Sequence, residues 1–519
     1  MKRSTAWLIA ALVLGLPYLS QGQESKPKYG GTLSFGIERD ISTLNPFVLM
    51  RSTDLYVRSL IYESLLDEDL KGNIIAGLAE SWNVSKDGLR YTFKLRRGVK
   101  FHNGQEVTAE DVKWCADYAM EPKNGSEGFI YLRGVNAVRA VDRTTVEFTL
   151  KQPRAVFLSY MATLRPFPVV PKGSVPAASD KIDNFPPGTG PFRFKEWKRL
   201  AQVVFTRNND YWQRGVPYLD QVIVKIAEDP TVRFTALRAG DLDMIERTPH
   251  AFVQKVDSGE VRNIKSTAAR FGGFRRIVFN VADAPFNNRK LREAVSYALD
   301  RKQFIQAAFW GYGTPVQQRI PAGNPWHVKL PERERDLAKV KALLKEAGVG
   351  DDFAMEILGR KGVEAEQQIL QQQLQSAGIK VKLLVLEGAA YRQQQRRGEF
   401  QAVLFGGDLP SDPADAYGPE YACDEESVQA KKRAMNMAGY CNKDLDRLLA
   451  QADSVTDQKK RRELYSRAIK IIHDEVPDLP LAYVPRFFTY HEKFKGFLTD
   501  ADGRFNGTTF GLSRIWMER

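Results

Sequence analysis

The chain has 519 residues, which is enough for two to four domains of ordinary size. Hydrophobic residues make up 43% of it and aromatic residues 11%, a composition that excludes a wholly disordered chain. The formal net charge is +13, but the basic residues lie in short scattered runs such as Arg96-Arg97 and Lys459–Arg462. We therefore interpret these runs as solvated faces rather than as a nucleic-acid-binding surface. Attraction to an anionic membrane or an anionic ligand is the alternative.

Residues 1–22 have the pattern of a secretory signal peptide. A basic start and the apolar stretch Ala6–Leu16 are followed by the small residues Ser20 and Gly22, at the minus-three and minus-one positions of a cut before Gln23. An uncleaved anchor is the alternative, and no cysteine follows the apolar stretch to accept a lipid. We therefore expect export from the cytoplasm.

The next segment, up to about residue 150, has the pattern of short antiparallel strands. We expect a hairpin at Lys86-Asp87-Gly88, because Asp-Gly between two β-rich runs favours a tight turn. Thr108 and Asp111 have the spacing of a capping box, which predicts a helix beginning at Ala109. The expected strands are Thr32–Ile37, Trp82–Val84, Tyr91–Leu95, Val99–Phe101 and Val141–Leu150, the last with a turn at Asp142-Arg143.

Residues 153–191 are rich in proline, which fits neither helix interiors nor central strands. We interpret this segment as a crossover between two lobes. Beyond it, strands are expected at Phe192–Trp197, Val203–Thr206 and Val222–Ile226, followed by a helix at Thr231–Ala239.

From about residue 277 the pattern becomes more helical, and strands and helices then alternate. The expected elements are helices Asn288–Asp300, Arg301–Phe309 and Arg333–Ala347, strand Ala354–Leu358, helix Glu364–Ser376, strand Lys380–Leu386, helix Ala389–Arg397 and strand Phe400–Phe405. Such alternation indicates parallel strands joined by right-handed crossovers. Ligands of open α/β sheets bind beyond the carboxyl ends of strands, where Asp408 follows Gly406 and Gly407. We interpret Asp408 as a binding carboxylate, with a helix cap or turn as the alternative.

The chain has three cysteines. In an oxidising compartment Cys423 and Cys441 are the obvious disulfide pair. Cys115 lies at helical spacing from Val112 and Ala119, so a buried, inert thiol is favoured over a reactive one.

No catalytic or cofactor motif is legible. None of the five histidines pairs with another at i, i+4, so we expect neither a metal site nor a cofactor. The segment Gly188-Thr189-Gly190-Pro191 lacks the third glycine of a dinucleotide loop, and its proline would break a phosphate cradle. We expect a binding protein rather than an enzyme, and an exported hydrolase built from dispersed carboxylates is the alternative.

A series of motifs runs in order along nearly the whole mature chain. They are Tyr62-Glu63-Ser64-Leu65-Leu66, Ala79-Glu80-Ser81-Trp82, Leu95–Gly104, Thr108–Val112, Gly188–Phe192, Asn209-Asp210-Tyr211-Trp212, Pro285–Asn288 and Asp478–Leu481. Together they resemble the signature of the family 5 extracellular solute-binding proteins, the periplasmic oligopeptide- and dipeptide-binding receptors of bacterial ABC importers.

This resemblance implies an α/β fold of the type II periplasmic-binding-protein class, with two lobes, two hinge strands and an extra domain inserted in the first lobe. The implied boundaries are 28–57, 190–276 and 488–519 for lobe I, 58–189 for the inserted domain and 277–487 for lobe II. The Tyr91–Asp111 signature is interpreted as structural.

The resemblance also implies site residues. In peptide-binding members an aspartate after a lobe II strand pairs with the peptide ammonium group, in a motif that resembles Gly407-Asp408-Leu409-Pro410-Ser411-Asp412-Pro413. We assign that role to Asp408, with Asp412 as the substitute and Gly406 and Gly407 beside it. Arg360 occupies the position of an arginine that binds the peptide carboxylate in dipeptide receptors, with a surface arginine as the alternative, and Asn45 is a further candidate from lobe I.

The function implied is capture of a small solute, short peptides above all, by hinge closure and delivery to an inner-membrane permease with cytoplasmic ATPase subunits. We expect a periplasmic monomer that meets the membrane through the permease only and binds no nucleic acid. The alternatives are an opine, an oligosaccharide or a nickel or haem chelate as ligand, an exported hydrolase, and a structural protein.

Overall fold

The protein is described by a computed structural model. The residues that it describes are 26–48, 52–69, 73–132, 134–175, 185–269, 272–320, 322, 324–408, 412–423, 425–430, 433, 435–497 and 512–518. The expected signal peptide, residues 1–22, lies outside them. Within these ranges no helix is both long and apolar enough to cross a membrane.

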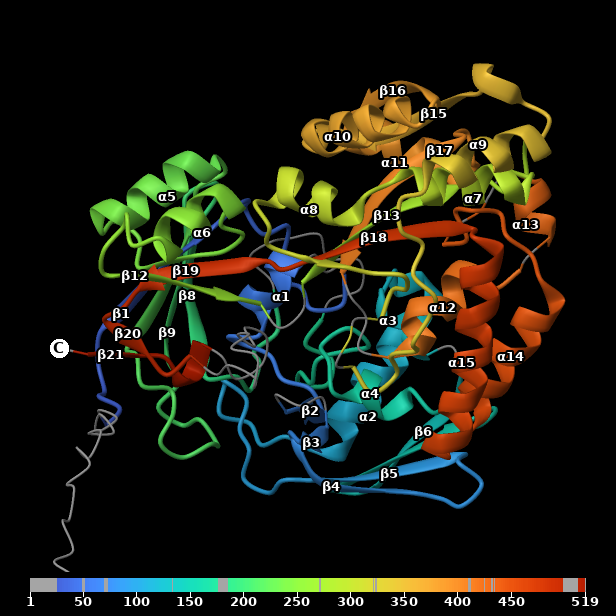
Figure 1. Ribbon diagram of the computed structural model, residues 1–519. Coiled ribbons are helices and arrows are strands. Elements are labelled where there is room, and N and C mark those ends of the chain that lie inside the picture. Colours follow the sequence, from blue (N-terminus) through green and yellow to red (C-terminus); the bar gives the residue numbers. More distant parts are fainter. Residues whose placement is uncertain are drawn as a thin grey trace, which may run out of the picture.

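Lobe I is built on a seven-stranded mixed sheet in the order β12-β19-β11-β1-β10-β9-β8 (Figure 1). Its central strand β1 is parallel to both β10 and β11, while β9 and β19 are antiparallel to their neighbours. The elements are β1 (Thr32–Ile37), α1 (Ser52–Arg58), β8 (Phe192–Lys198), β9 (Gln202–Arg207), β10 (Gln221–Ile226), α5 (Pro230–Ala239), β11 (Met244–Ile245), α6 (His250–Asp257), β12 (Ile264–Ala268) and β19 (Phe487–His491). Short pairs near the chain end are β20 (Phe494–Lys495) and β21 (Trp516–Met517), beside η3 (Leu512–Arg514).

The inserted domain is a four-stranded antiparallel sheet in the order β4-β5-β7-β6, with α2 packed on it. Its elements are β2 (Leu66–Glu68), β3 (Ile74–Ala76), β4 (Ala79–Val84), β5 (Arg90–Leu95), α2 (Ala109–Met120), η1 (Pro122–Asn124), α3 (Gly128–Leu132), β6 (Val135–Asp142), β7 (Thr145–Leu150) and α4 (Phe157–Met161). The expected hairpin at Gly88 and the helix start at Ala109 are confirmed, with the Asp111 carboxylate accepting from Thr108 N at 2.8 Å.

One expectation in this domain was incomplete and one was wrong. The turn expected at Asp142-Arg143 is present, with Asp142 ending β6 and accepting from Thr144 N, but the strand before it begins at Val135 rather than at Val141. Val99–Phe101 is not a strand, because Gly104 N turns back onto Phe101 O and only one bridge, Lys100 to Glu106, forms.

Lobe II is built on a six-stranded sheet in the order β14-β18-β13-β17-β15-β16. Its strands are β13 (Gly273–Phe279), β14 (Thr314–Pro315), β15 (Ala354–Arg360), β16 (Lys380–Leu386), β17 (Ala402–Asp408) and β18 (Asp478–Val484). Its helices are α7 (Arg289–Ala298), α8 (Arg301–Phe309), α9 (Leu337–Glu346), η2 (Gly350–Asp352), α10 (Glu364–Ser376), α11 (Gly388–Arg397), α12 (Pro413–Tyr421), α13 (Glu425–Gln429), α14 (Lys443–Ser454) and α15 (Gln458–Glu475). Helix α9 begins at Leu337 rather than near Arg333, because Asp336 caps it.

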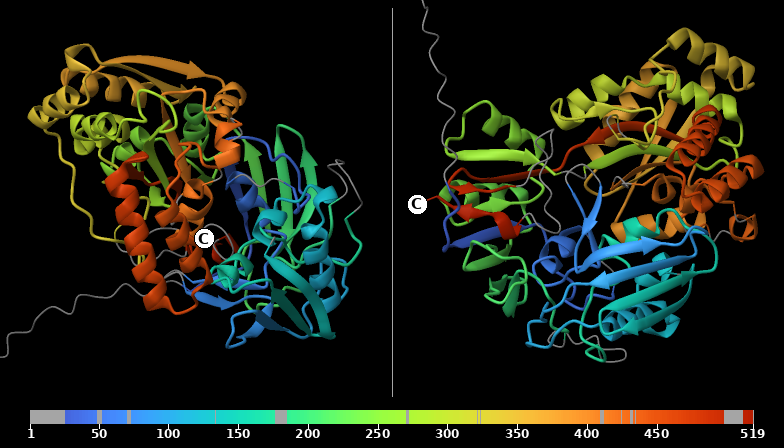
Figure 2. Two further views of the ribbon diagram at one scale, coloured as in Figure 1. Left: turned by 90° about the vertical axis from the view of Figure 1, so that its right-hand side faces the viewer. Right: turned by 90° about the horizontal axis from the view of Figure 1, so that it is seen from below.

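The chain passes between the two sheets twice, from β12 to β13 and from β18 to β19 (Figures 1 and 2). Strands β12 and β19 pair in the first sheet, β13 and β18 pair in the second, and Ala269 N donates to Arg486 O at 2.6 Å between them. The expected pair of hinge strands is therefore present. Strand β13 joins the lobe II sheet at Gly273, four residues before the boundary expected at 277.

The grouping of buried side chains into hydrophobic cores differs from the grouping of strands into sheets. One continuous apolar core extends from lobe I through the inserted domain, and a smaller cluster lies under α5 and α6. Lobe II has separate cores on the two faces of its sheet, one with α7 to α10 and one with α12, α14 and α15. The inserted domain is thus packed as a part of lobe I.

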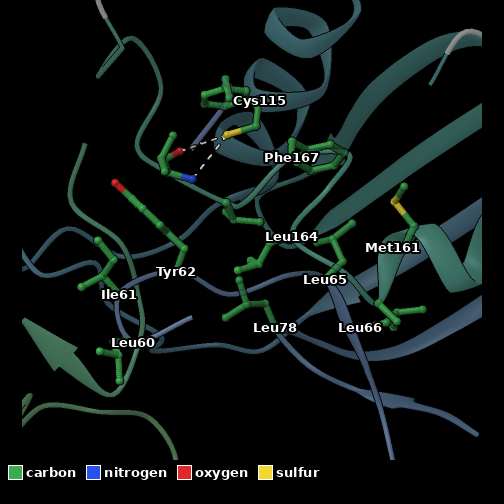
Figure 3. Packing of buried hydrophobic residues seen from close by; sticks show 14 of the residues in the cluster. Leu60, Ile61, Tyr62, Leu65, Leu66, Leu78, Cys115, Met161, Leu164 and Phe167 are labelled. Carbon is green, nitrogen blue, oxygen red and sulfur yellow. Dashed lines mark hydrogen bonds between the residues drawn. The ribbon is translucent and has the colours of Figure 1, made fainter. Parts of the chain in front are cut away.

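Cys115 lies inside the continuous core (Figure 3). Its thiol donates to Val170 O at 3.3 Å and accepts from Val170 N at 3.4 Å. Burial raises the pKa of the Cys115 thiol well above its usual value. The expectation of a buried, free cysteine is confirmed.

Candidate functional site

The candidate site begins at the carboxyl edge of the lobe II sheet. Strands β15, β16 and β17 are rich in buried aliphatic residues and pair in parallel, with Leu358 opposite both Leu384 and Val403. Their carboxyl ends therefore share one edge, as the alternation of strands and helices predicts.

Asp408 is the last residue of β17, and its backbone lies opposite Gly273. Gly273 is the first residue of β13 after the chain has crossed from lobe I, so Asp408 is placed where the two lobes meet. The sequence position alone indicates a strand end, and the pairing with β13 adds that this end faces the hinge.

Gly406 and Gly407 have packing reasons to be glycine. A Cβ atom on Gly406 would lie 2.6 Å from Arg275 Nη1, and one on Gly407 would lie 3.1 Å from the Phe274 ring. The space beside Gly406 is used by Arg275, whose guanidinium makes two hydrogen bonds to Glu366 of α10, at 2.6 and 3.1 Å. Both glycines thus let β13 and its side chains approach β17 closely.

Asp412, the substitute for Asp408, is already engaged. Its carboxylate accepts from Arg461 Nη1 at 2.7 Å and Nη2 at 2.6 Å, and it caps α12 by accepting from Ala414 N. Burial opposes the charge on Arg461, but the bonds from Asp412 raise its pKa above the usual value. This geometry gives Asp412 a structural role, which leaves Asp408 as the stronger candidate for an incoming cation.

Arg360 ends β15 at the same sheet edge and is exposed. Extending the β15–β17 register puts position 360 level with 405, so Asp408 lies three residues further along the neighbouring strand. At ordinary strand spacings the two backbones are about 11 Å apart. Within the described part of the chain no ion pair of Arg360 is seen.

Asn45 makes a local turn rather than lining an open surface. Its side-chain oxygen accepts from Phe47 N at 3.0 Å, and only 8% of the residue is exposed. Nothing in this geometry favours a ligand contact.

The two lobes also touch away from the hinge, at a contact that the sequence did not indicate. We call it the junction, and it joins Arg154, Ala155 and Tyr160 of the inserted domain to Asp415 and Asp453 of lobe II. The Tyr160 hydroxyl donates to Asp415 Oδ1 at 2.7 Å, Ala155 N donates to Asp453 O at 2.9 Å, and Arg154 Nε lies 3.7 Å from Asp453 Oδ2.

The junction contains a carboxyl group with an unusual acidity. Burial raises the pKa of Asp415 to about 6, and the hydrogen bond from Tyr160 only partly offsets that effect. The negative charge of Asp412, one turn earlier, raises it further. No signal for Asp415 was legible in the sequence, because its partner Tyr160 is 255 residues away.

The disulfide expected between Cys423 and Cys441 is present, with their Cα atoms 4.7 Å apart. It joins the segment after α12 to the segment before α14, and Cys423 N also donates to Asp446 of α14 at 2.9 Å. The helix that carries Asp412 and Asp415 is therefore tied to the helix that ends near Asp453.

The carboxyl edge of the lobe II sheet thus contains Arg360 and Asp408, and the backbone of Asp408 lies opposite Gly273, the first residue of β13. Among the residues that the structure describes, no group of three or more His, Cys, Asp or Glu side chains could hold a metal ion.

The chain is similar to known proteins in sequence and in fold. A family model for bacterial extracellular solute-binding proteins, family 5, middle part, matches residues 73–427. Among similar sequences, the glutathione-binding protein GsiB of Escherichia coli K12 is 30% identical over 467 residues, which covers 88% of this chain and 89% of that protein.

Solved structures with the same fold include two with bound ligands. The periplasmic binding protein DppA from Helicobacter pylori, in complex with the peptide STSA, superposes with a TM-score of 0.80 at 26% identity, covering 95% of this chain and 99% of that one. AgaA of A. tumefaciens R10, in complex with agropinic acid, has a TM-score of 0.79 at 26% identity and covers 94% and 99%.

Proposed function

We propose that this protein captures short peptides between its two lobes, on the premise that the chain belongs to the family 5 bacterial extracellular solute-binding proteins. Proteins of this family are the solute-binding components of ABC importers and are not enzymes. The observation that carries the proposal is the position of Asp408, at the carboxyl end of a parallel strand and opposite the first residue after the hinge.

The chemistry of a short peptide fits this edge. A peptide ammonium group paired with the Asp408 carboxylate would make a charge-assisted hydrogen bond, which is stronger than a neutral one and costly to leave unmatched. Arg360 offers a forked donor pair that suits a terminal carboxylate. The names of the relatives support the same class, because GsiB is a glutathione-binding protein and DppA was solved with a peptide.

The physiological setting follows from the family. We propose that the signal peptide, residues 1–22, directs the protein to the periplasm, where it works as a monomer. It would deliver its ligand to an inner-membrane permease driven by cytoplasmic ATPase subunits. Hinge closure around the ligand needs no cofactor.

The first test is the ligand itself. Protein purified without denaturation is precipitated, and the released small molecules are identified by mass spectrometry. Short peptides would support the proposal. A non-peptide ligand in their place would leave the receptor role intact and contradict the proposed ligand class. The two outcomes need to be distinguished because AgaA was solved with agropinic acid.

The second test is a charge substitution. Asp408→Asn is expected to weaken binding of short peptides by about 1.5 to 3 kcal/mol, because it removes the charge and keeps the shape. Calorimetric titration with glutathione and the peptide STSA measures it. Asp444→Asn, an exposed aspartate of α14, is the matched control and should leave affinity unchanged.

Two further variants sharpen this test. Asp412→Asn should lower thermal stability, because it leaves Arg461 without its buried partner, whereas Asp408→Asn should not. Arg360→Ala should weaken the binding of peptides with a free carboxyl terminus and barely change the binding of their amidated analogues. Equal affinities for wild type and Asp408→Asn across all binders would contradict the proposed role of Asp408.

A further inference from the structure

The junction connects the two bodies that the hinge allows to move relative to one another, so it can act on that motion. Arg154 and Tyr160 are held within the inserted domain, whose core is continuous with lobe I. Asp415 and Asp453 are on α12 and α14, which pack on one face of the lobe II sheet. Figure 1 shows α4 beside these lobe II helices, away from the crossing of β18 into β19.

The inserted-domain side of the junction is built in advance. The Arg154 guanidinium donates to Tyr131 O at 2.9 Å and lies 4.9 Å from the centre of the Tyr160 ring. The Arg154 carbonyl accepts from the Tyr91 hydroxyl at 3.1 Å, and the Tyr131 and Tyr160 rings pack edge to face at 5.1 Å. These contacts lie within one domain, so they persist whatever lobe II does.

The lobe II side is equally fixed. Asp412 and its partner Arg461 hold the start of α12, and the disulfide ties the end of α12 to α14. Ala414, between Asp412 and Asp415, packs against both the inserted-domain core and the lobe II core. Two rigid surfaces therefore meet at the junction, and a rotation about the hinge strands separates them.

We propose that the junction is a closure latch: Tyr160 and Arg154 bind Asp415 and Asp453 only when the lobes are closed, and so populate the closed state before ligand arrives. The latch rests on hinge closure, which the proposed function also uses, but it does not depend on the ligand being a peptide. It raises affinity without touching the ligand, because a receptor already closed part of the time has paid part of the conformational cost of binding.

The test uses the ligand-free, full-length mature protein, prepared by unfolding, dialysis and refolding. Small-angle X-ray scattering then reports the balance of open and closed forms. Tyr160→Phe removes the hydroxyl and leaves the Asp415 carboxylate buried without a donor, so its radius of gyration is expected to increase. Glutathione and the peptide STSA serve as probes, and each should bind Tyr160→Phe about 5- to 10-fold more weakly through faster dissociation.

Two controls separate a latch from general damage. Tyr118→Phe removes a hydroxyl from α2 of the same domain, where the ring packs against Phe47 and Trp114, and should behave as wild type. In an Asp415→Leu background, Tyr160→Phe should leave the scattering profile unchanged, because the hydroxyl then has no carboxylate partner to lose.

The outcomes divide cleanly. Wild-type scattering for Tyr160→Phe overturns the latch, and so does an equal opening by Tyr160→Phe in the Asp415→Leu background. If neither probe binds the wild-type protein, the peptide proposal loses its support while the scattering comparison still decides the latch.

Discussion

Asp412 and Asp415 stand one helical turn apart, yet their neighbours give them opposite properties. The Arg461 guanidinium donates to both carboxylate oxygens of Asp412, so the two opposite charges of this pair compensate each other. Asp415 faces the neutral Tyr160 hydroxyl, and its pKa rises to about 6 because it is buried without a direct cation. The residue type alone therefore does not predict the properties of either aspartate until its partner, Arg461 or Tyr160, is known.

The raised pKa of Asp415 predicts that acid favours closure. The carboxyl binds its proton more tightly in the closed state than in an open state where it meets water, so closure is strongest below the ordinary aspartate pKa and weakens as pH rises through about 6. The groups facing Asp415 are Asp412 on its own helix and Tyr131, Tyr160, Arg154 and Arg165 from the inserted domain.

Scattering of ligand-free protein between pH 5 and pH 8 checks this prediction. The closed fraction should fall as pH rises, and Asp415→Asn should remove the dependence between pH 5.5 and 7 because it cannot ionise. A pH profile unchanged by Asp415→Asn would assign the effect to another group.

At the scale of elements, α12 is the part of lobe II on which both candidate sites depend. It follows directly after the strand that ends at Asp408, it begins with the Asp412 cap, and it carries Asp415 in its first turn. The disulfide and the Asp446 hydrogen bond anchor its far end. Contacts at both of its ends therefore hold α12 in place relative to the sheet edge.

Removing the disulfide is expected to loosen this element. Replacing Cys423 and Cys441 by serine should lower the free energy of unfolding by about 3 kcal/mol, mainly by freeing the unfolded chain. Thermal or urea unfolding measures the change. Thiol counting supplies the control: denatured wild-type protein without reductant should expose one thiol, that of Cys115, and three thiols would contradict the disulfide.

At the scale of the whole molecule, the inserted domain and lobe I share one core, while lobe II has its own. Glu63 joins the first two, because its buried carboxylate accepts from Thr189, Tyr211 and Trp212. Several motifs of the family signature thus serve the union of two domains rather than ligand contact. The motion available to the protein is that of lobe II against this combined body.

The shared core predicts that the inserted domain and lobe I lose stability together. Leu95→Ala, in a fully buried position of β5, should cost about 2 to 5 kcal/mol. Hydrogen exchange should show faster opening in β5 and also in β1 of lobe I, with β15 to β17 of lobe II little changed. Faster exchange confined to the inserted domain would show that it unfolds independently.

Local patterns predicted much of the secondary structure because they act over a few residues. Helix α10 and strand β16 have the expected bounds, with Gly378 following the end of α10, and the Thr108 cap set the start of α2. The turn expected at Asp142-Arg143 is present, but the strand before it begins at Val135 rather than at Val141. Helix α4, within the proline-rich segment, had no periodic signal to reveal it.

The sequence by itself determined the family, the α/β class, the disulfide pair and the position of Asp408 at the end of a strand, because each rests on neighbouring residues or on an ordered set of motifs. Only the tertiary structure decided that the backbone of Asp408 pairs with the first residue of β13, that Arg461 forms an ion pair with Asp412, and that Tyr160 donates to Asp415. These depend on pairing between segments up to 255 residues apart, and no local pattern encodes which distant side chain will satisfy a buried charge.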